Sequence, residues 1–271
     1  MTTAQKVIKY LAIAFAIFLI IVITSTLVMG IYGLSSLFGK KQESTTSTLE
    51  TINCQYNDFI TNLEIDLEKS NLEIKVGDSF IVQTNNKNIV CNKKDNQLEI
   101  KEKDKKFEIT NDYKTLIIYI PKSLYFNEIE VDTGIGNVNI DYIKANILSL
   151  NLGIGETTIN DILSNIAKIE TGVGKVNINS GNINNLDMDT GIGEVNVISK
   201  ITGSSKIDAG VGNLNLYLLG NENDYKLNIN KGIGNILING NSVGDKQIIG
   251  NGISVIDVDG GIGKININYR Q

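Results

Sequence analysis

A hydrophobic pattern recurs along the second half of the chain. In each copy, apolar residues stand two apart on either side of a Gly-Ile-Gly or Gly-Val-Gly tripeptide, and most positions between them are polar. A period of two residues is typical of β-strands, because successive side chains point to opposite faces. Each copy therefore predicts two short strands that meet at a glycine corner.

The tripeptide occurs seven times between residues 128 and 271, and its first five copies begin 19 residues apart. The last two steps are 22 and 29 residues. A constant period near 20 residues indicates a solenoid, in which each repeat is one coil that stacks on the next. We therefore predict an all-β fold, with a β-solenoid (β-helix) of about seven short coils over residues 128–271.

The glycines are the predicted structural corners of these coils. Glycine adopts positive φ without a steric penalty and leaves room for one corner to stack closely on the next. We expect the Ile or Val between each pair of glycines to point inward and fill the corner. The predicted corner glycines are Gly134, Gly136, Gly153, Gly155, Gly172, Gly174, Gly191, Gly193, Gly210, Gly212, Gly232, Gly234, Gly261 and Gly263.

An Asp, Glu or Asn stands two residues before each tripeptide, and stacking would align these side chains into a surface ladder. Divalent cations such as Ca²⁺ bind oxygen ligands of this kind. However, Asp and Asn also cap turns through their side chains, and the Gly-Gly-x-Gly-x-Asp sequence of calcium-binding repeats is absent. We therefore expect turn capping rather than a metal site. The acidic members of the ladder are Asp132, Glu170, Asp189, Asp208 and Asp259.

Asparagine recurs at a second outward position, five residues after the start of most tripeptides. Identical amides that stack along a common axis hydrogen-bond into ladders. We expect this column to stabilise the stacking register.

The chain begins with a short polar segment and a long uncharged apolar stretch. Because about 20 apolar residues are enough to cross a bilayer, we predict a cytoplasmic tail over residues 1–9, a transmembrane helix over residues 10–34 and a polar linker over residues 35–49. A cleaved signal peptide is the alternative, but no Ala-x-Ala cleavage pattern follows. Lysines flank both ends of the stretch, so the charge comparison is nearly even. We favour the repeats outside the cell.

Residues 50–127 alternate like strands but lack the tripeptide. We expect this N-terminal β region to cap the solenoid, because a bare solenoid end exposes unpaired strand groups. It contains both cysteines of the chain, Cys54 and Cys91. They could form a disulfide outside the membrane or remain two buried thiols.

The last repeat is preceded by an insertion, residues 239–256. It could fold over the final coil as a cap, or the last strand could stay open and accept another chain by strand addition. We expect the cap, since the insertion directly precedes the final coil and contains the apolar pair Ile248 and Ile249.

Composition excludes several classes of function. The 271 residues include no His, which is the commonest general base and metal ligand. The net charge is −5, the only Arg is Arg270, and no basic stripe of the kind that binds nucleic acid is present. Neither a Walker sequence nor Gly-x-Ser-x-Gly occurs. We expect no enzymatic activity, no catalytic residue, no cofactor and no nucleic-acid partner.

The order of motifs is similar to that of a known family. The run Asn71–Asp78 (NLEIKVGD) is followed by Leu98–Lys101 (LEIK), Leu116–Pro121 (LIIYIP) and the repeats that begin at Asp132. Over residues 60–271 this order resembles the DUF4097 family of bacterial proteins, which are named as adhesins. The resemblance implies a strand-rich start followed by glycine-containing repeats. It also implies a link to the cell-envelope stress systems of Gram-positive bacteria for some members.

We therefore expect a single-pass membrane protein that acts as a surface interaction module, either an adhesin or a partner in envelope stress. Its partner would be a protein or a cell-wall glycan. The alternative is a structural scaffold similar to bactofilins, which polymerises end to end at the membrane.

Overall fold

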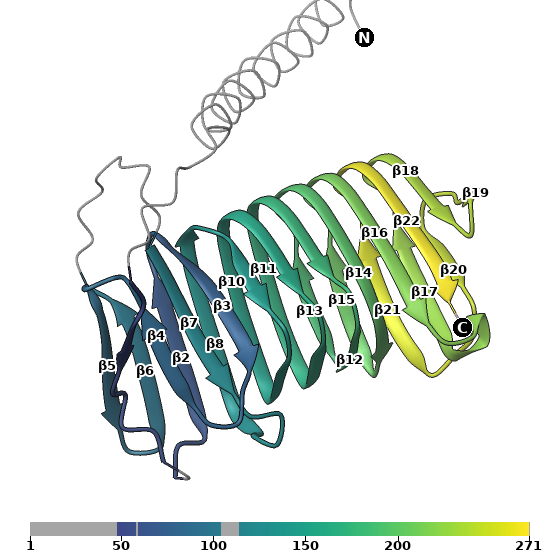
Figure 1. Ribbon diagram of the computed structural model, residues 1–271. Coiled ribbons are helices and arrows are strands. Elements are labelled where there is room, and N and C mark those ends of the chain that lie inside the picture. The colour runs from purple at the N-terminus through teal and green to yellow at the C-terminus, as the bar shows by residue number, and fades with distance from the viewer. Residues whose placement is uncertain (1–47, 58, 104–113, 271) are drawn as a thin grey trace, which may run out of the picture. The chain divides into compact units, whose positions relative to one another are not determined.

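The computed structural model describes residues 48–57, 59–103 and 114–270, and their regular structure is almost entirely β-strand (Figure 1). The prediction of an all-β fold is confirmed. The predicted tail and transmembrane helix, and the linker as far as residue 47, lie outside the described residues. Within the residues that are described, no helix is long and apolar enough to cross a membrane.

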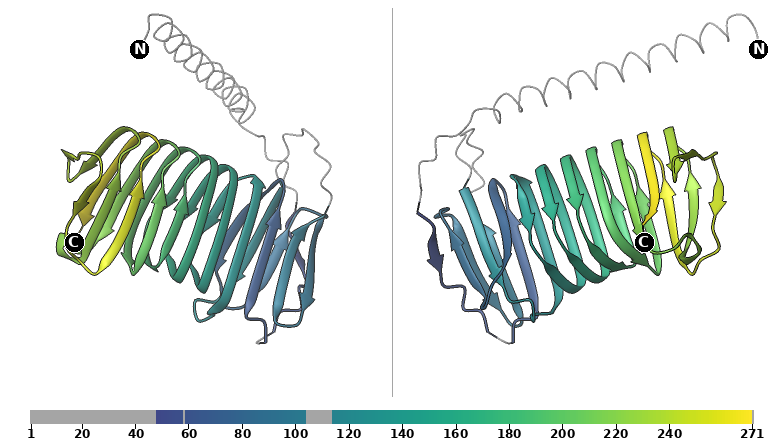
Figure 2. Two further views of the ribbon diagram at one scale, coloured as in Figure 1. Left: turned by 180° about the vertical axis from the view of Figure 1, so that it is seen from behind. Right: turned by 45° about the vertical axis from the view of Figure 1, so that its right-hand side comes forward.

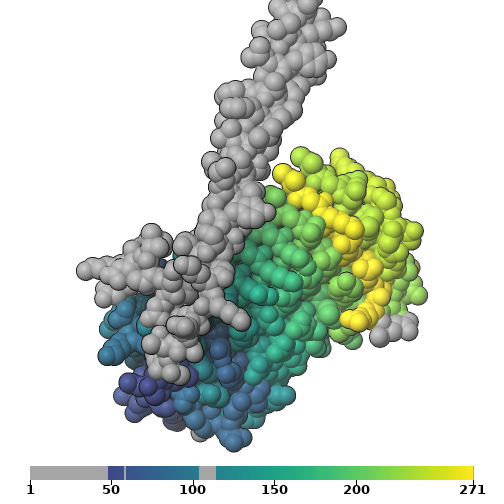
Figure 3. Space-filling model, turned by 45° about the horizontal axis from the view of Figure 1, so that its top comes forward, coloured from purple at the N-terminus to yellow at the C-terminus, as the bar shows by residue number. Residues whose placement is uncertain are grey.

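The repeats stack as parallel coils (Figure 1). In the space-filling view the colours follow one another along the stack, and yellow atoms lie next to green ones at its C-terminal end (Figure 3). Ile143 pairs with Ile162, and Glu156 with Lys175, so that each residue lies beside the residue 19 positions further on. At this offset one repeat forms one coil of a solenoid, and neighbouring coils are about 4.8 Å apart. The strands of these coils are β8 (Phe126–Ile135), β9 (Val138–Ile140), β10 (Ile143–Ile159), β11 (Ile162–Ile178), β12 (Gly181–Asn184), β13 (Leu186–Asp189), β14 (Ile192–Thr202), β15 (Ser204–Asp208) and β16 (Val211–Leu219).

The inward positions of the coils form one continuous core. Leu148, Ile169 and Val197 are completely buried, and the equivalent positions of the other repeats are also buried. Burial of one such side chain contributes about 1.5–3 kcal/mol. Where Ser205 replaces an apolar residue, its hydroxyl accepts a hydrogen bond of 2.9 Å from the backbone N–H of Leu186. The described core extends from Cys54 to Ile267 within one compact unit, so residues 48–271 contain all of it.

The C-terminal coils do not stack in the order in which they follow one another in the chain. β21 pairs in parallel with both β15 and β17, and β22 pairs with both β16 and β18. The last coil of the chain is therefore the second layer from the end, and the expectation that it terminates the stack is wrong. The elements involved are the short 3₁₀ helix η1 (Glu222–Asp224), β17 (Tyr225–Asn230), β18 (Ile233–Ile238), β21 (Ser254–Asp259) and β22 (Ile262–Arg270).

A side chain of β22 gives a physical reason for this order. Asn266 Nδ2 donates a hydrogen bond of 2.6 Å to Asn215 Oδ1 on the neighbouring coil. The equivalent residue on β18 is Leu237, whose side chain cannot form this hydrogen bond. Because β22 lies between β16 and β18, the column of stacked asparagines extends by one coil, to Asn266. The coil that has Leu237 at this position lies at the end of the stack.

Two further coils come from the region that the sequence predicted only as a cap. β2 (Asn62–Leu67) and β3 (Ser70–Val76) pair with β8 and β9 on one side, and with β6 (Gln97–Glu102) and β7 (Lys114–Ile120) on the other. Leu63 lies beside Ile129 in the same inward column. At this end too, the coil nearest the chain terminus lies one layer inside the stack.

Short antiparallel strands cover both ends of the stack (Figures 1 and 2). At the N-terminal end, β4 (Ile81–Thr84) pairs with β7, β5 (Ile89–Lys94) with β6, and β1 (Glu50–Ile52) with β4. At the other end, β19 (Asn241–Ser242) pairs with β18, and β20 (Gln247–Ile249) with β17. The insertion therefore acts as a cap, but on the coil of β17 and β18 rather than on the last coil of the chain.

Removal of residues 241–251 should turn a monomer into a concentration-dependent oligomer. The deletion exposes the outer edges of β17 and β18, whose free backbone groups can pair with another molecule. Light scattering on residues 48–271, with and without the deletion, measures this. A deletion variant that stays monomeric at high concentration would show that these strands do not protect the edge.

Candidate functional site

The predicted corner glycines all lie against the backbone of the neighbouring coil. A Cβ atom added to any of them would meet a backbone oxygen of that coil at 1.7–2.4 Å. The second glycine of each pair also has positive φ, 146° at Gly193 and 136° at Gly212. The first glycine, such as Gly191, does not. Close stacking therefore requires glycine at both positions, whereas backbone conformation requires it only at the second.

The Ile or Val between the glycines lies on the surface. Val211, Ile262 and Ile233 are 42%, 48% and 73% exposed, and their counterparts in the other coils are half-buried. The expectation that these residues point inward and fill the corner is wrong, since the buried positions next to the tripeptide are instead those of residues such as Leu152 and Val176. We call this row the apolar ridge; in stack order it is Ile135, Ile154, Val173, Ile192, Val211, Ile262 and Ile233.

The structure aligns the predicted acidic side chains into one row, which we call the carboxylate ladder. Its two amides donate to neighbouring carboxylates: Asn151 Nδ2 to Asp132 Oδ1, and Asn230 Nδ2 to Asp259 Oδ1, both at 2.6 Å. Among the described residues, no group of three or more His, Cys, Asp or Glu side chains could hold a metal ion. In stack order the ladder is Asp132, Asn151, Glu170, Asp189, Asp208, Asp259 and Asn230.

The exchanged order of the C-terminal layers crowds three aspartates of the ladder. Asp189, Asp208 and Asp259 occupy successive coils. Burial raises the pKa of Asp189, and its hydrogen bond to Asp208 and the charge of that residue raise the pKa further. Lys206 lowers the pKa of Asp208 by donating a hydrogen bond of 2.5 Å to Oδ2. The lysine thus favours the ionised form of Asp208, whereas the surroundings of Asp189 make its ionisation less favourable.

A groove of about 440 Å³ follows the ladder over four coils. Its lining includes Asp132 and Glu170 of the ladder and the corner glycines Gly134, Gly153 and Gly172. Sequence reasoning missed two carboxylates that also line this groove, Asp66 and Glu68. The sequence contains a signal for Asp66, because Leu63-Glu-Ile-Asp66 has the same pattern as Ile129-Glu-Val-Asp132 of the first repeat.

A ladder of asparagine amides stabilises the opposite side of the corners, as predicted. Asn196 Nδ2 donates to Asn177 Oδ1 at 2.9 Å, and Asn215 Nδ2 donates to Asn196 Oδ1 at 2.8 Å. With Asn266 the ladder spans four coils. It fixes the register of the coils and carries no charge of its own.

The coil of β2 and β3 has a corner without glycines, and sequence reasoning did not identify how it is held. Glu102 Oε2 accepts hydrogen bonds of 3.0 Å from the backbone N–H groups of Glu68 and Lys69. Glu102 Oε1 accepts one of 2.7 Å from Asn86 Nδ2. A single carboxylate therefore satisfies backbone donors of this corner.

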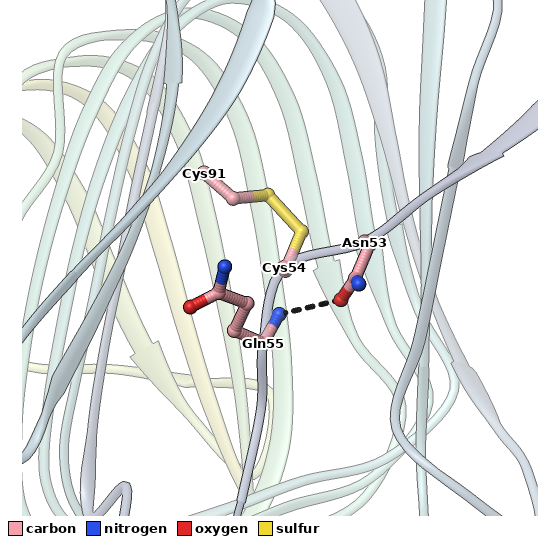
Figure 4. Close-up of a disulfide and its surroundings, with 4 residues drawn as sticks. All are labelled: Asn53, Cys54, Gln55 and Cys91. Carbon is pink, nitrogen blue, oxygen red and sulfur yellow. Dashed lines mark hydrogen bonds between the residues drawn. A yellow bond between two sulfur atoms is a disulfide. The ribbon is translucent and has the colours of Figure 1, made fainter.

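The two cysteines form a disulfide, which settles the alternative that the sequence left open. The Cα atoms of Cys54 and Cys91 are 5.0 Å apart, and the bond joins the segment after β1 to β5 (Figure 4). Beside it, the backbone N–H of Gln55 donates a hydrogen bond of 3.0 Å to Asn53 Oδ1. The bond ties the entry of the chain to the strand that covers the N-terminal end of the stack.

Comparison with known proteins identifies the family of this chain. The family model described as Toastrack DUF4097 matches residues 60–248, so the chain belongs to the DUF4097 family. Among curated proteins no match was found.

Similar solved structures carry names that refer to adhesion. A "putative adhesin" from Bacteroides fragilis is 16% identical over 84% of this chain and 100% of that chain, with a TM-score of 0.43. A "putative cell adhesion protein" from Clostridium sporogenes is 16% identical over 82% of this chain and 98% of that chain, with a TM-score of 0.36.

Gly193→Ala should destabilise the protein by about 2 kcal/mol or more, because the new Cβ would require both a positive φ and displacement of a neighbouring backbone oxygen. That oxygen, on Gly174, lies 1.8 Å from the position of the Cβ. Urea unfolding measures the change. Gly244→Ala is the matched control, since its nearest neighbour would be 3.4 Å away. Equal stability of the two variants would contradict close stacking at the corner.

Asp189→Asn should be more stable than the wild type at neutral pH. The folded state holds the proton of Asp189 more tightly than the unfolded chain does, so ionisation of this group costs stability as the pH rises. The advantage of the variant should therefore grow as the pH rises from about 4, the ordinary pKa of an aspartate, towards neutrality. Thermal unfolding over this range measures it, with Asp141→Asn, away from the ladder, as the control. A variant less stable than the wild type at pH 7 would refute the crowding of these carboxylates.

Proposed function

We propose that this protein is a non-enzymatic interaction module, held at the cell membrane by residues 10–34 with its coils outside the cell. The observation that carries the proposal is the long edge of the stack, where a carboxylate ladder runs beside an apolar ridge. A groove follows the ladder over four coils, and the ridge is exposed further along the stack, at Val211, Ile262 and Ile233. Contiguous apolar surface that is exposed to water is a mark of interaction sites. The partner would be a protein or a cell-wall glycan.

Two other features support this location and role. The Cys54–Cys91 disulfide suits an oxidising environment, such as the outside of the cell. Antiparallel strands cover both ends of the stack, which favours a single rod over a bactofilin-like scaffold that grows end to end.

Labelling of an introduced cysteine on intact cells tests the orientation. Ile253 is 95% exposed, so Ile253→Cys offers a reactive thiol without disturbing the core. A membrane-impermeant maleimide should label this variant on intact cells, and the labelled protein should sediment with the membranes. Thr3→Cys, in the predicted cytoplasmic tail, is the matched control and should react only after permeabilisation. The reverse pattern would refute the proposal.

A further inference from the structure

The apolar ridge is a surface without a partner in the described part of the chain. Its side chains are β-branched and in register, each paired with the equivalent residue of the next coil. Exposure is greatest at Val211, Ile262 and Ile233, at 42%, 48% and 73%. Seven residues at the spacing of parallel strands form a row about 29 Å long. Covering it would remove a continuous strip of apolar surface from water.

The carboxylate ladder runs beside the ridge in the same coils, three residues earlier in each repeat. Two of its acids are paired with lysines of their own coil, Glu170 with Lys168 at 2.7 Å and Asp208 with Lys206. Within the described residues, Asp132, Asp189 and Asp259 have no such ion pair. On its other side the ridge is bordered by a column in which Glu156 and Glu194 are matched by Lys175 and Lys264. The unmatched carboxylates of the ladder therefore leave an excess of negative charge beside the ridge, and a complementary partner must be both apolar and basic.

The spacing of the coils selects the conformation of that partner. Side chains on one face of an extended strand repeat every 6.8 Å or so, which loses register with coils about 4.8 Å apart within two or three layers. Successive turns of a helix repeat at about 5.4 Å, which flexible basic side chains can match over several layers. The coils also use their backbone groups to pair with one another, so a helix, which satisfies its own, fits better than a strand.

We propose that the apolar ridge and the carboxylate ladder form a docking surface for a basic amphipathic helix of a partner protein, lying along the axis of the stack. The helix presents an apolar stripe to the ridge and an adjacent stripe of Lys or Arg to the ladder. This assignment rests on the proposed function, because it names the surface through which the interaction module binds. An anionic lipid surface fits less well, since the ladder repels it.

The probe for this site is a synthetic helix of 18 residues, about 27 Å long, in which a stripe of Leu runs beside a stripe of Lys. Its control has the same composition in scrambled order, so that no stripes form. Binding of each labelled peptide to residues 48–271 is followed by fluorescence anisotropy. The striped peptide should bind saturably. The scrambled peptide should bind at least about tenfold more weakly, because it has no continuous row of leucines to cover the ridge.

Two sets of variants assign the binding to the named residues. Joint replacement of Val211, Ile233 and Ile262 by Ser should weaken binding about tenfold, and Asp208→Asn with Asp259→Asn should weaken it severalfold and reduce its salt dependence. Ile253→Ser, and Asp141→Asn with Asp161→Asn at the opposite turn of the coil, are the matched controls and should bind like the wild type. Thermal unfolding verifies that every variant is folded.

Three results would overturn the assignment. Equal binding of the striped and scrambled peptides would show attraction by charge alone. Binding that survives the serine variant would place the site elsewhere. A wild-type dimer that the serine variant dissociates would show that a second copy of the chain covers the ridge. If the coils are outside the cell and the peptide does not bind, only the docking surface is refuted; if labelling places them inside, the proposed function itself fails.

Discussion

Close contact between the backbones of successive corners is the constraint on which the rest of the structure depends. At Gly174 and Gly193 the coils approach so closely that not even a methyl group fits between them. This contact fixes each coil at one offset from the next, because a slip by one residue would place a side chain where only a glycine can stand. This fixed offset between the coils aligns the buried columns, the asparagine ladder and the surface rows.

In-register stacking also explains why the surface divides into uniform strips. A residue type that recurs at one position of the repeat becomes a column, whether it is buried like Leu148, amide like Asn196 or acidic like Asp189. The columns on the two sides of the corner differ in charge. On one side the uncharged asparagines satisfy one another through hydrogen bonds, whereas on the other side aspartates occupy successive coils. A cationic partner of the proposed kind would relieve the repulsion between these aspartates.

The periodicity of the sequence predicted the features that depend on one repeat alone, namely the strands, the buried positions and the asparagine ladder. It failed where the outcome depends on contacts between distant segments. The order of the C-terminal layers follows from the contact of Asn266 with Asn215, 51 residues apart. The exposure of residues such as Val211 depends on how the chain turns at the glycine corner, which alternation cannot reveal. Cys54 and Cys91 meet only because β5 folds back over the end of the stack.

The position of the chain's terminal coils has a mechanical consequence. Both the first coil, β2 and β3, and the last, β21 and β22, lie between two other layers. A pull on the chain near residue 48 meets β1 and then the Cys54–Cys91 bond before it reaches a coil. That coil cannot peel from an open edge, since its strands must shear against neighbours on two sides at once. The stack therefore resists tension applied near residue 48, and within the described residues neither β2 nor β22 lies at an open edge from which unfolding could begin.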